Sequence, residues 1–207
     1  MAAWMFDTLL RPIIDPPLNA AARMVARAGL SANAVTVLGG AAGVAAGVSV
    51  AAGQFVLAVA LIALSRLADG LDGPLARQTR STDLGGYLDV IADYAFYTAI
   101  PIGFAFARPE WALPAACLLG GFLMASTSFL GFATLAAKRG LETEAQGKKS
   151  FFYLGGLAEG AETIAVLGLS ALVPAWFPVL AYGYAVVCVL TVAGRVAAAM
   201  QLLGEAR

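Results

Sequence analysis

Long apolar runs separated by short polar segments make up most of the chain after residue 30. A helix needs about 20 apolar residues to cross the hydrocarbon core of a bilayer. Six runs of this kind predict spans at residues 34–52, 55–76, 84–107, 111–137, 151–172 and 177–203. No strand-like alternation and no long linker interrupts them. The pattern therefore predicts an all-α polytopic membrane protein, with one domain over residues 1–207 and a six-helix bundle at 34–203.

The first thirty residues follow a different pattern. Large apolar side chains such as Trp4 and Phe6 alternate with charged ones such as Asp7 and Arg11, which leaves no uninterrupted apolar core for a cleaved signal peptide. Arg23 and Arg27 are one helical turn apart and share a face. This pattern predicts an amphipathic helix over residues 1–30 that lies on the membrane surface.

The composition agrees with a membrane protein, since 60% of the residues are apolar and only 13% are charged. Cytoplasmic loops of membrane proteins are rich in Lys and Arg. In the predicted topology Arg108 lies on one side and Arg66 inside a span, while the remaining cations lie on the other side: Arg11, Arg23, Arg27, Arg77, Arg80, Lys138, Arg139, Lys148, Lys149, Arg195 and Arg207. The asymmetry predicts that both termini face the cytoplasm. Cys117 and Cys188 stand alone in apolar runs and are interpreted as packing residues.

Four aspartates are the main exception to the apolar pattern: Asp69, Asp72, Asp89 and Asp93 lie in or beside the second and third spans. A charged side chain at the membrane centre costs roughly 2.5–3.5 kcal/mol on insertion scales, so such residues mark functional sites by default. Helical spacing places Asp69 and Asp72 on one face, and Asp89 and Asp93 on another. The two spans are joined by a short loop, so their acidic faces are predicted to converge. Carboxylates without nearby His or Cys favour Mg²⁺ or Mn²⁺, and the site has enough ligands for two such ions.

Small residues add to the picture in two ways. Gly39, Gly43 and Gly47 recur every four residues in the first span, which is typical of close helix packing. Gly73 and Gly85 share the face of the aspartates, and there we expect the missing side chains to make room for a ligand.

The pattern Asp69-x2-Asp72-Gly73-x2-Ala76-Arg77-x7-Gly85-x3-Asp89-x3-Asp93 resembles the signature of the CDP-alcohol phosphotransferases. The predicted six spans and surface helix also resemble that family. Residues 31–36, SANAVT, are similar to a Pro-Asn-x-x-Thr motif of the family without its proline. The resemblance implies transfer of a phosphatidyl or similar group from a CDP-linked lipid to a hydroxyl acceptor, with release of CMP, in phospholipid biosynthesis.

The resemblance also implies roles for individual residues. Asp69, Asp72, Asp89 and Asp93 would bind the metal ions, and Asp93 would be the general base. A second group would bind the CDP moiety: Gly73, Ala76, Arg77, Gly85, Asn33 and Thr36. The sequence contains no histidine, so histidine-dependent mechanisms are excluded and a carboxylate is the natural base.

The acceptor is less well defined. Lys148 and Lys149 precede the fifth span, where they either meet an acidic acceptor or anionic lipid or serve as ordinary positive-inside anchors. Glu159 and Glu162 are predicted to form a buried pair within that span. We expect them either to hold a cationic or polyhydroxyl acceptor or to pair with Arg66.

The alternative function is an ion or metal transporter, because intramembrane carboxylates also mark ion pathways. No inverted repeat or matched pair of broken helices supports it. The favoured interpretation is an integral enzyme of a bacterial inner membrane with a cytoplasmic active site. Its expected partners are the lipid donor, a small alcohol or phosphoalcohol and a second copy of the chain, and no nucleic acid.

Overall fold

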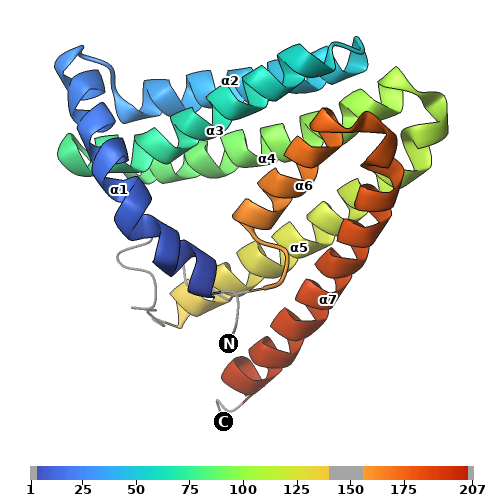
Figure 1. The fold of residues 1–207 in the computed structure, drawn as a ribbon. Coiled ribbons are helices and arrows are strands. Elements are labelled where there is room, and N and C mark those ends of the chain that lie inside the picture. The colour runs from blue at the N-terminus through green and yellow to red at the C-terminus, as the bar shows by residue number, and fades with distance from the viewer. Residues whose placement is uncertain (1–3, 140–155, 205–207) are drawn as a thin grey trace.

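The computed structural model describes residues 4–139 and 156–204, with side chains for 16–139 and 156–203. In this part of the chain all the regular structure is helical (Figure 1). The α-helices are α1 (Trp4–Arg27), α2 (Ala32–Ala51), α3 (Phe55–Gln78), α4 (Asp83–Ala107), α5 (Ala112–Lys138), α6 (Gly160–Leu172) and α7 (Phe177–Gly204). Short 3-10 turns at Pro109–Trp111 and Pro174–Trp176 precede α5 and α7.

Local signals in the sequence explain where several helices begin and turn. The Ser31 hydroxyl accepts a hydrogen bond from the Ala34 amide and caps α2, and Thr82 caps α4 in the same way through the Gly85 amide. Gly29 and Gly53 have positive φ angles of 80° and 70°, which glycine adopts without strain, and they lie in the turns after α1 and α2. The helices therefore agree closely with five of the six predicted spans.

The fifth span differs from the prediction. A helix was expected from residue 151, but α6 begins at Gly160 and residues 156–159 are not helical. The hydroxyl of Thr191 on α7 accepts hydrogen bonds from the amides of Leu157 (3.1 Å) and Ala158 (2.8 Å). These tertiary bonds satisfy amides that a helix would otherwise use, and residues 157 and 158 form a bend before α6.

Helix α2 packs against both α3 and α4, whose ribbons can be followed in Figure 1. The glycines of α2 allow the close approach. A Cβ atom on Gly47 would lie 2.4 Å from the Ala99 carbonyl oxygen of α4, and one on Gly43 would lie 2.9 Å from Phe96 Cβ. The packing role predicted for these glycines agrees with this geometry. Helices α3 and α4 make little direct backbone contact over their described lengths. Room for side chains and cavities therefore remains between them.

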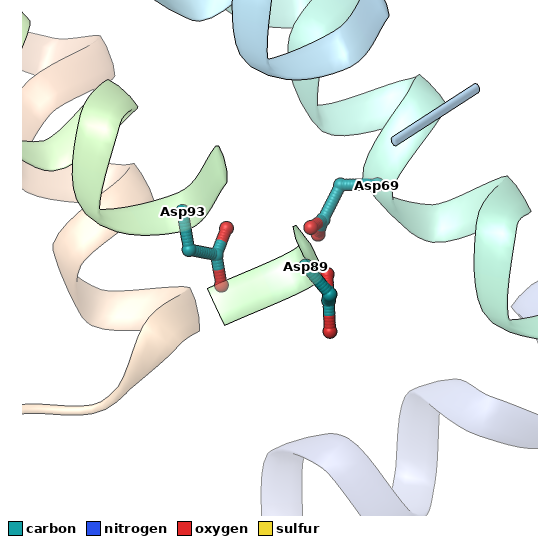
Figure 2. A group of neighbouring side chains, drawn as sticks. All are labelled: Asp69, Asp89 and Asp93. Atoms are coloured by element: carbon teal, nitrogen blue, oxygen red, sulfur yellow. The ribbon is translucent and has the colours of Figure 1, made fainter. Parts of the chain in front are cut away.

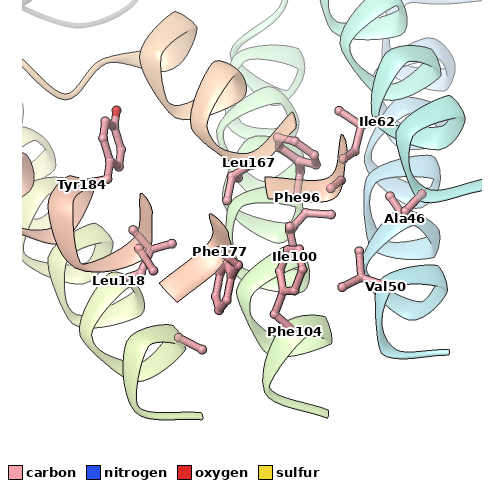
Figure 3. Close-up of a cluster of buried hydrophobic side chains, with 14 of the residues drawn as sticks. Ala46, Val50, Ile62, Phe96, Ile100, Phe104, Leu118, Leu167, Phe177 and Tyr184 are labelled. Carbon is pink, nitrogen blue, oxygen red and sulfur yellow. The ribbon is translucent and has the colours of Figure 1, made fainter. Parts of the chain in front are cut away.

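The hydrophobic core joins α4 to the C-terminal helices (Figure 3). The rings of Phe104 and Phe177 stack with centroids 4.0 Å apart, and Trp111 lies against both. Ile100 and Phe96 are also fully buried, one and two turns before Phe104 on α4. This core fixes α4, and with it the aspartates at its N-terminal end, relative to α6 and α7.

Among the described residues, four helical segments are long and apolar enough to cross a membrane, judged by length and composition: Ala32–Ala51, Asp83–Ala107, Pro109–Lys138 and Pro174–Leu203. Helix α3 carries Arg66, Asp69, Asp72 and Arg77, and α6 has only 13 residues. The apolar helices thus agree with an integral membrane protein, while the six-span topology remains a prediction. Helix α1 packs on α3, where Gln78 Nε2 donates to the Asn19 carbonyl oxygen at 3.2 Å.

Candidate active site

Three of the four aspartates meet between α3 and α4. Asp69 comes from α3, and Asp89 and Asp93 come from successive turns of α4 (Figure 2). One carboxylate oxygen from each residue lies within 4.8 Å of the others, and all three side chains are partly exposed. Three converging carboxylates are a hard oxygen donor set, which fits Mg²⁺ or Mn²⁺. The convergence predicted from helical spacing is therefore present for Asp69, Asp89 and Asp93.

Asp72 has a different environment. It is 9% exposed, and its Oδ2 accepts a hydrogen bond of 2.6 Å from the Thr36 hydroxyl of α2. It does not belong to the group of three carboxylates within 4.8 Å. The Thr36 hydroxyl also lies 3.1 Å from the Ala32 carbonyl oxygen, but its single proton favours the shorter contact with the carboxylate. Thr36 thus holds an aspartate in place, a contact that the sequence did not predict.

Arg66 lies beside the three converging carboxylates. Its Nη1 is 2.7 Å from Asp93 Oδ1 and 3.6 Å from Asp69 Oδ2. The suggestion that Arg66 pairs with Glu159 or Glu162 is wrong, because the arginine is engaged by the aspartates instead.

A first cavity of about 370 Å³ opens between α2, α3 and α4. Its lining includes every residue predicted to bind the CDP moiety, namely Asn33, Thr36, Gly73, Ala76, Arg77 and Gly85. Asp72 and Asp89 line it as well. We name it the α2–α4 cavity.

The two glycines of this cavity differ in what surrounds them. A Cβ atom on Gly85 would lie 2.9 Å from the Asn33 side-chain oxygen, so a larger residue would displace that amide. A Cβ atom on Gly73 would meet only Arg77 Nη1, at 3.5 Å. A side chain at position 85 would therefore require the Asn33 amide to move, whereas one at position 73 would meet only the end of the Arg77 side chain.

A second cavity of about 240 Å³ reaches Asp93, and we name it the α4–α7 cavity. Asp93 and Val90 line it from α4, Ser126 and Phe129 from α5, Glu159 from the segment before α6, and Arg195 from α7. Arg195 is only 7% exposed, and its Nη1 donates to the Ala125 carbonyl oxygen at 2.9 Å. Val90 lines both cavities, so the three carboxylates lie near their junction.

Among the described residues, the two glutamates predicted to bind the acceptor lie in different environments, and only one of them lines the α4–α7 cavity. Glu159 is partly buried, lines the α4–α7 cavity and accepts a 2.8 Å hydrogen bond from the Gly156 amide. Glu162 is exposed, so the predicted buried pair is wrong: Glu162 lies in the first turn of α6 and does not line this cavity. Lys148 and Lys149 lie outside the described residues.

Two arginines of the cavities had no assigned site role in the sequence analysis. Arg195 was counted only as a cytoplasmic charge, although it interrupts the apolar run TVAGRVAAAM. The rule that singled out the aspartates applies equally to it. Arg80 lies in the loop after α3 and lines the α2–α4 cavity beside Arg77, a position that depends on the course of the loop.

Comparisons with known proteins agree with this geometry. The family model of the CDP-alcohol phosphatidyltransferases matches residues 30–193. The Escherichia coli K12 inner membrane protein YnjF is 43% identical over 193 residues, which cover 93% of this chain and 94% of YnjF. The chain therefore belongs to the CDP-alcohol phosphatidyltransferase family and is an enzyme of that class.

Solved structures show the same fold. Phosphatidylinositol phosphate synthase PgsA1 of Mycobacterium tuberculosis, crystallised with manganese and citrate, superposes with a TM-score of 0.66 and 26% identity, covering 87% of each chain. The structure of PgsA1 with CDP-DAG bound gives a TM-score of 0.67 and 25% identity, covering 88% of this chain and 93% of PgsA1.

Proposed function

We propose that this enzyme transfers a phosphatidyl or similar phosphoalcohol group from a CDP-linked lipid, such as CDP-diacylglycerol, to the hydroxyl group of an acceptor and releases CMP. The observation that carries the proposal is the position of the aspartates at the junction of two cavities. A transferase needs a donor and an acceptor on either side of the reacting phosphate, and the two cavities provide such places. The structure of PgsA1 with CDP-DAG bound supports the choice of donor.

The donor would occupy the α2–α4 cavity. Arg77 and Arg80 line it and would contact the diphosphate, since a guanidinium binds phosphate oxygens through charge-assisted hydrogen bonds. Asn33, Thr36, Gly73, Ala76 and Gly85 would surround the nucleotide. Gly73 lines this cavity, and its missing side chain would let a ligand come close to the α3 backbone.

Asp69, Asp72, Asp89 and Asp93 would hold the divalent cations, which we propose to be two Mg²⁺ or Mn²⁺ ions. Bound divalent cations neutralise the negative charge of a diphosphate and orient it. The carboxylate cluster fits such ions by its donor atoms, and PgsA1 was crystallised with manganese. Thr36 would keep the Asp72 carboxylate turned toward the site.

The acceptor would occupy the α4–α7 cavity, with its hydroxyl group next to Asp93. Asp93 accepts the hydroxyl proton as the acceptor oxygen forms its bond to phosphorus, and the bond from phosphorus to CMP breaks. Glu159 would contact the acceptor because it lines the same cavity. Lys148 and Lys149 remain candidates for an acidic acceptor or anionic lipid.

For the whole molecule we propose six spans, a surface-lying α1, cytoplasmic termini and active site, a bacterial inner membrane location and a homodimer. The positive-inside asymmetry supports the orientation. The match to an inner membrane protein of Escherichia coli supports the location. Family membership favours the enzyme over the transporter that intramembrane carboxylates alone would allow.

The test is release of CMP by the purified protein in detergent, with CDP-diacylglycerol as donor and a panel of alcohols and phosphoalcohols as acceptors. We expect release that needs Mg²⁺ or Mn²⁺, stops on chelation and increases with one acceptor of the panel. A protein that stays folded and releases no CMP from CDP-diacylglycerol with any acceptor would contradict the proposal.

A further inference from the structure

Arg66 is held firmly between the core and the aspartates. Its guanidinium carbon lies 4.2 Å from the centroid of the buried Phe96 ring, and its Nη2 donates to the buried Ser65 hydroxyl at 3.0 Å. Its Nη1 donates to Asp93 Oδ1 at 2.7 Å. These contacts come from two helices and lock the planar group in one orientation.

The burial of this arginine carries an energetic cost. Its side chain is only 11% exposed, whereas its partners Asp69 and Asp93 are 34% and 30% exposed. Its Nε is buried and has no hydrogen-bond partner within the described part of the chain. A buried donor without a partner is destabilising, and an ion pair with partly exposed carboxylates returns little stability. Stability alone is therefore a poor explanation for Arg66.

The hydrogen bond from Arg66 places the two carboxylate oxygens of Asp93 in different environments. Oδ1 accepts a hydrogen bond from Arg66, whereas Oδ2 accepts none from the described residues, and the carboxylate lines the α4–α7 cavity. Arg66 lies three residues before Asp69 and thus outside the aspartate signature. It reaches Asp93 across the space between α3 and α4, where the two backbones do not pack closely.

We infer that Arg66 is the positioning residue for Asp93: it binds Oδ1 so that the other oxygen is presented to the acceptor hydroxyl in the α4–α7 cavity. The inference rests on the proposed function, in which Asp93 takes the acceptor proton. It has a second consequence that does not depend on turnover. One positive charge next to three carboxylates weakens their attraction for a divalent cation, and Nη1 occupies an oxygen that such a cation would use.

The experiment compares Arg66→Gln, which removes the charge, with Arg66→Lys, which keeps it. Arg108→Gln is the matched control, because Arg108 also pairs with an acid, Glu110 at 3.9 Å, and lies over an aromatic ring, Trp111 at 4.7 Å, but is 59% exposed at the C-terminal end of α4. The measurements are kcat, the donor KM, thermal stability in detergent, and Mn²⁺ binding without donor, followed by electron paramagnetic resonance of free Mn²⁺.

For Arg66→Gln we expect kcat to fall about 30-fold or more while the donor KM changes less than about threefold, because a misplaced base slows the chemical step. Mn²⁺ binding should become about fivefold tighter, as a cation is removed from beside its ligands. Arg66→Lys should keep Mn²⁺ affinity near that of the wild type, with an intermediate kcat. Arg108→Gln should change neither quantity.

If Arg66 has only a structural role, Arg66→Gln should have lower thermal stability, while the kcat of the folded variant and its Mn²⁺ affinity should equal those of the wild type. That result would overturn the inference. If Arg66→Gln does not fold, the kcat of Arg66→Lys tests the inference instead. Lysine keeps the charge but lacks the planar guanidinium that contacts Asp93 and Ser65 together, so a wild-type kcat in Arg66→Lys would overturn the inference.

The metal measurement separates this inference from the proposed function. If the wild type released no CMP, the proposed function would fail, and Mn²⁺ binding would still report on the Arg66–Asp93 contact. In an Asp93→Asn background the effect of Arg66→Gln on Mn²⁺ binding should shrink by about half or more. Full additivity of the two changes would mean that Arg66 does not act through Asp93.

Discussion

At the scale of single residues, Asp72 differs from the other three aspartates because it is buried and hydrogen-bonded to a side chain of α2. Its buried carboxylate accepts a short hydrogen bond from Thr36 on a third helix. Helical spacing predicts that Asp69, Asp89 and Asp93 converge. It does not predict the partner of Asp72, because that contact depends on how closely α2 approaches α3, and this follows from glycine packing rather than from the aspartate motif.

Thr36 offers a direct test of that contact. Thr36→Val keeps the shape of the side chain but leaves the Asp72 oxygen without its donor, which costs about 1–3 kcal/mol for a buried charged group. We expect lower thermal stability in detergent and weaker metal-dependent donor binding. Thr36→Ser restores the hydroxyl and should behave like the wild type. Equal behaviour of the two variants would show that the hydrogen bond has no role.

Arg77 and Arg80 both line the α2–α4 cavity, but they differ in backbone support. Arg77 extends from the last turn of α3, whereas Arg80 lies in the following loop. Arg77→Ala should therefore raise the donor KM about tenfold or more, the effect of losing a charge-assisted hydrogen bond, and Arg80→Ala should raise it less. Steady-state kinetics with varied CDP-diacylglycerol measures both. The reverse ranking would place the diphosphate at the loop.

At the scale of helices, the glycines of α2 determine how α3 and α4 are arranged. Gly47→Ala would place a Cβ atom 2.4 Å from a carbonyl oxygen of α4, a rigid neighbour that cannot rotate away. Overpacking of this kind costs about 1–3 kcal/mol. We expect a clear fall in melting temperature. Gly120→Ala on α5 is the control, since a Cβ atom there meets nothing within 4 Å. Similar stability of the two variants would contradict the packing of α2 on α4.

The start of α6 shows the limit of prediction from sequence for a whole element. The apolar run from 151 indicates a helix, and no proline marks a later beginning. The hydroxyl of Thr191, far away in sequence, holds residues 157 and 158 out of the helix. A single sequence carries no local signal for such a contact. The other predicted spans agree with the helices because their boundaries coincide with glycines, prolines and polar caps.

The two glutamates near this boundary provide a matched pair. Glu159 lines the α4–α7 cavity, while Glu162 is exposed one turn later. Glu159→Gln should raise the acceptor KM by about threefold to tenfold and leave the donor KM unchanged, since a hydrogen bond to a charged group is lost. Glu162→Gln should change neither. A donor defect in Glu159→Gln would remove Glu159 from the acceptor side.

At the scale of the whole molecule, two cavities adjoin one group of carboxylates, and in the proposed function each would hold one of the two substrates. The α2–α4 cavity contacts Asp72 and Asp89, and the α4–α7 cavity contacts Asp93. The hydrophobic core between α4, α6 and α7 holds the second cavity in place. Different aspartates should therefore affect donor binding and the chemical step to different degrees, although they lie within one small cluster.

The most direct test of this account compares Asp93→Asn with Asp89→Ala for both donor binding and turnover. Asp93→Asn keeps an oxygen ligand but loses the proton acceptor, so we expect turnover to fall at least about 100-fold with metal-dependent binding of CDP-diacylglycerol largely retained. Asp89→Ala should lose donor binding and turnover together, because in the proposed function Asp89 would bind a metal ion in the α2–α4 cavity and alanine offers no oxygen ligand. Substantial CMP release by Asp93→Asn, measured under saturating substrates and Mn²⁺, would contradict the assignment of Asp93 as the base between the two cavities.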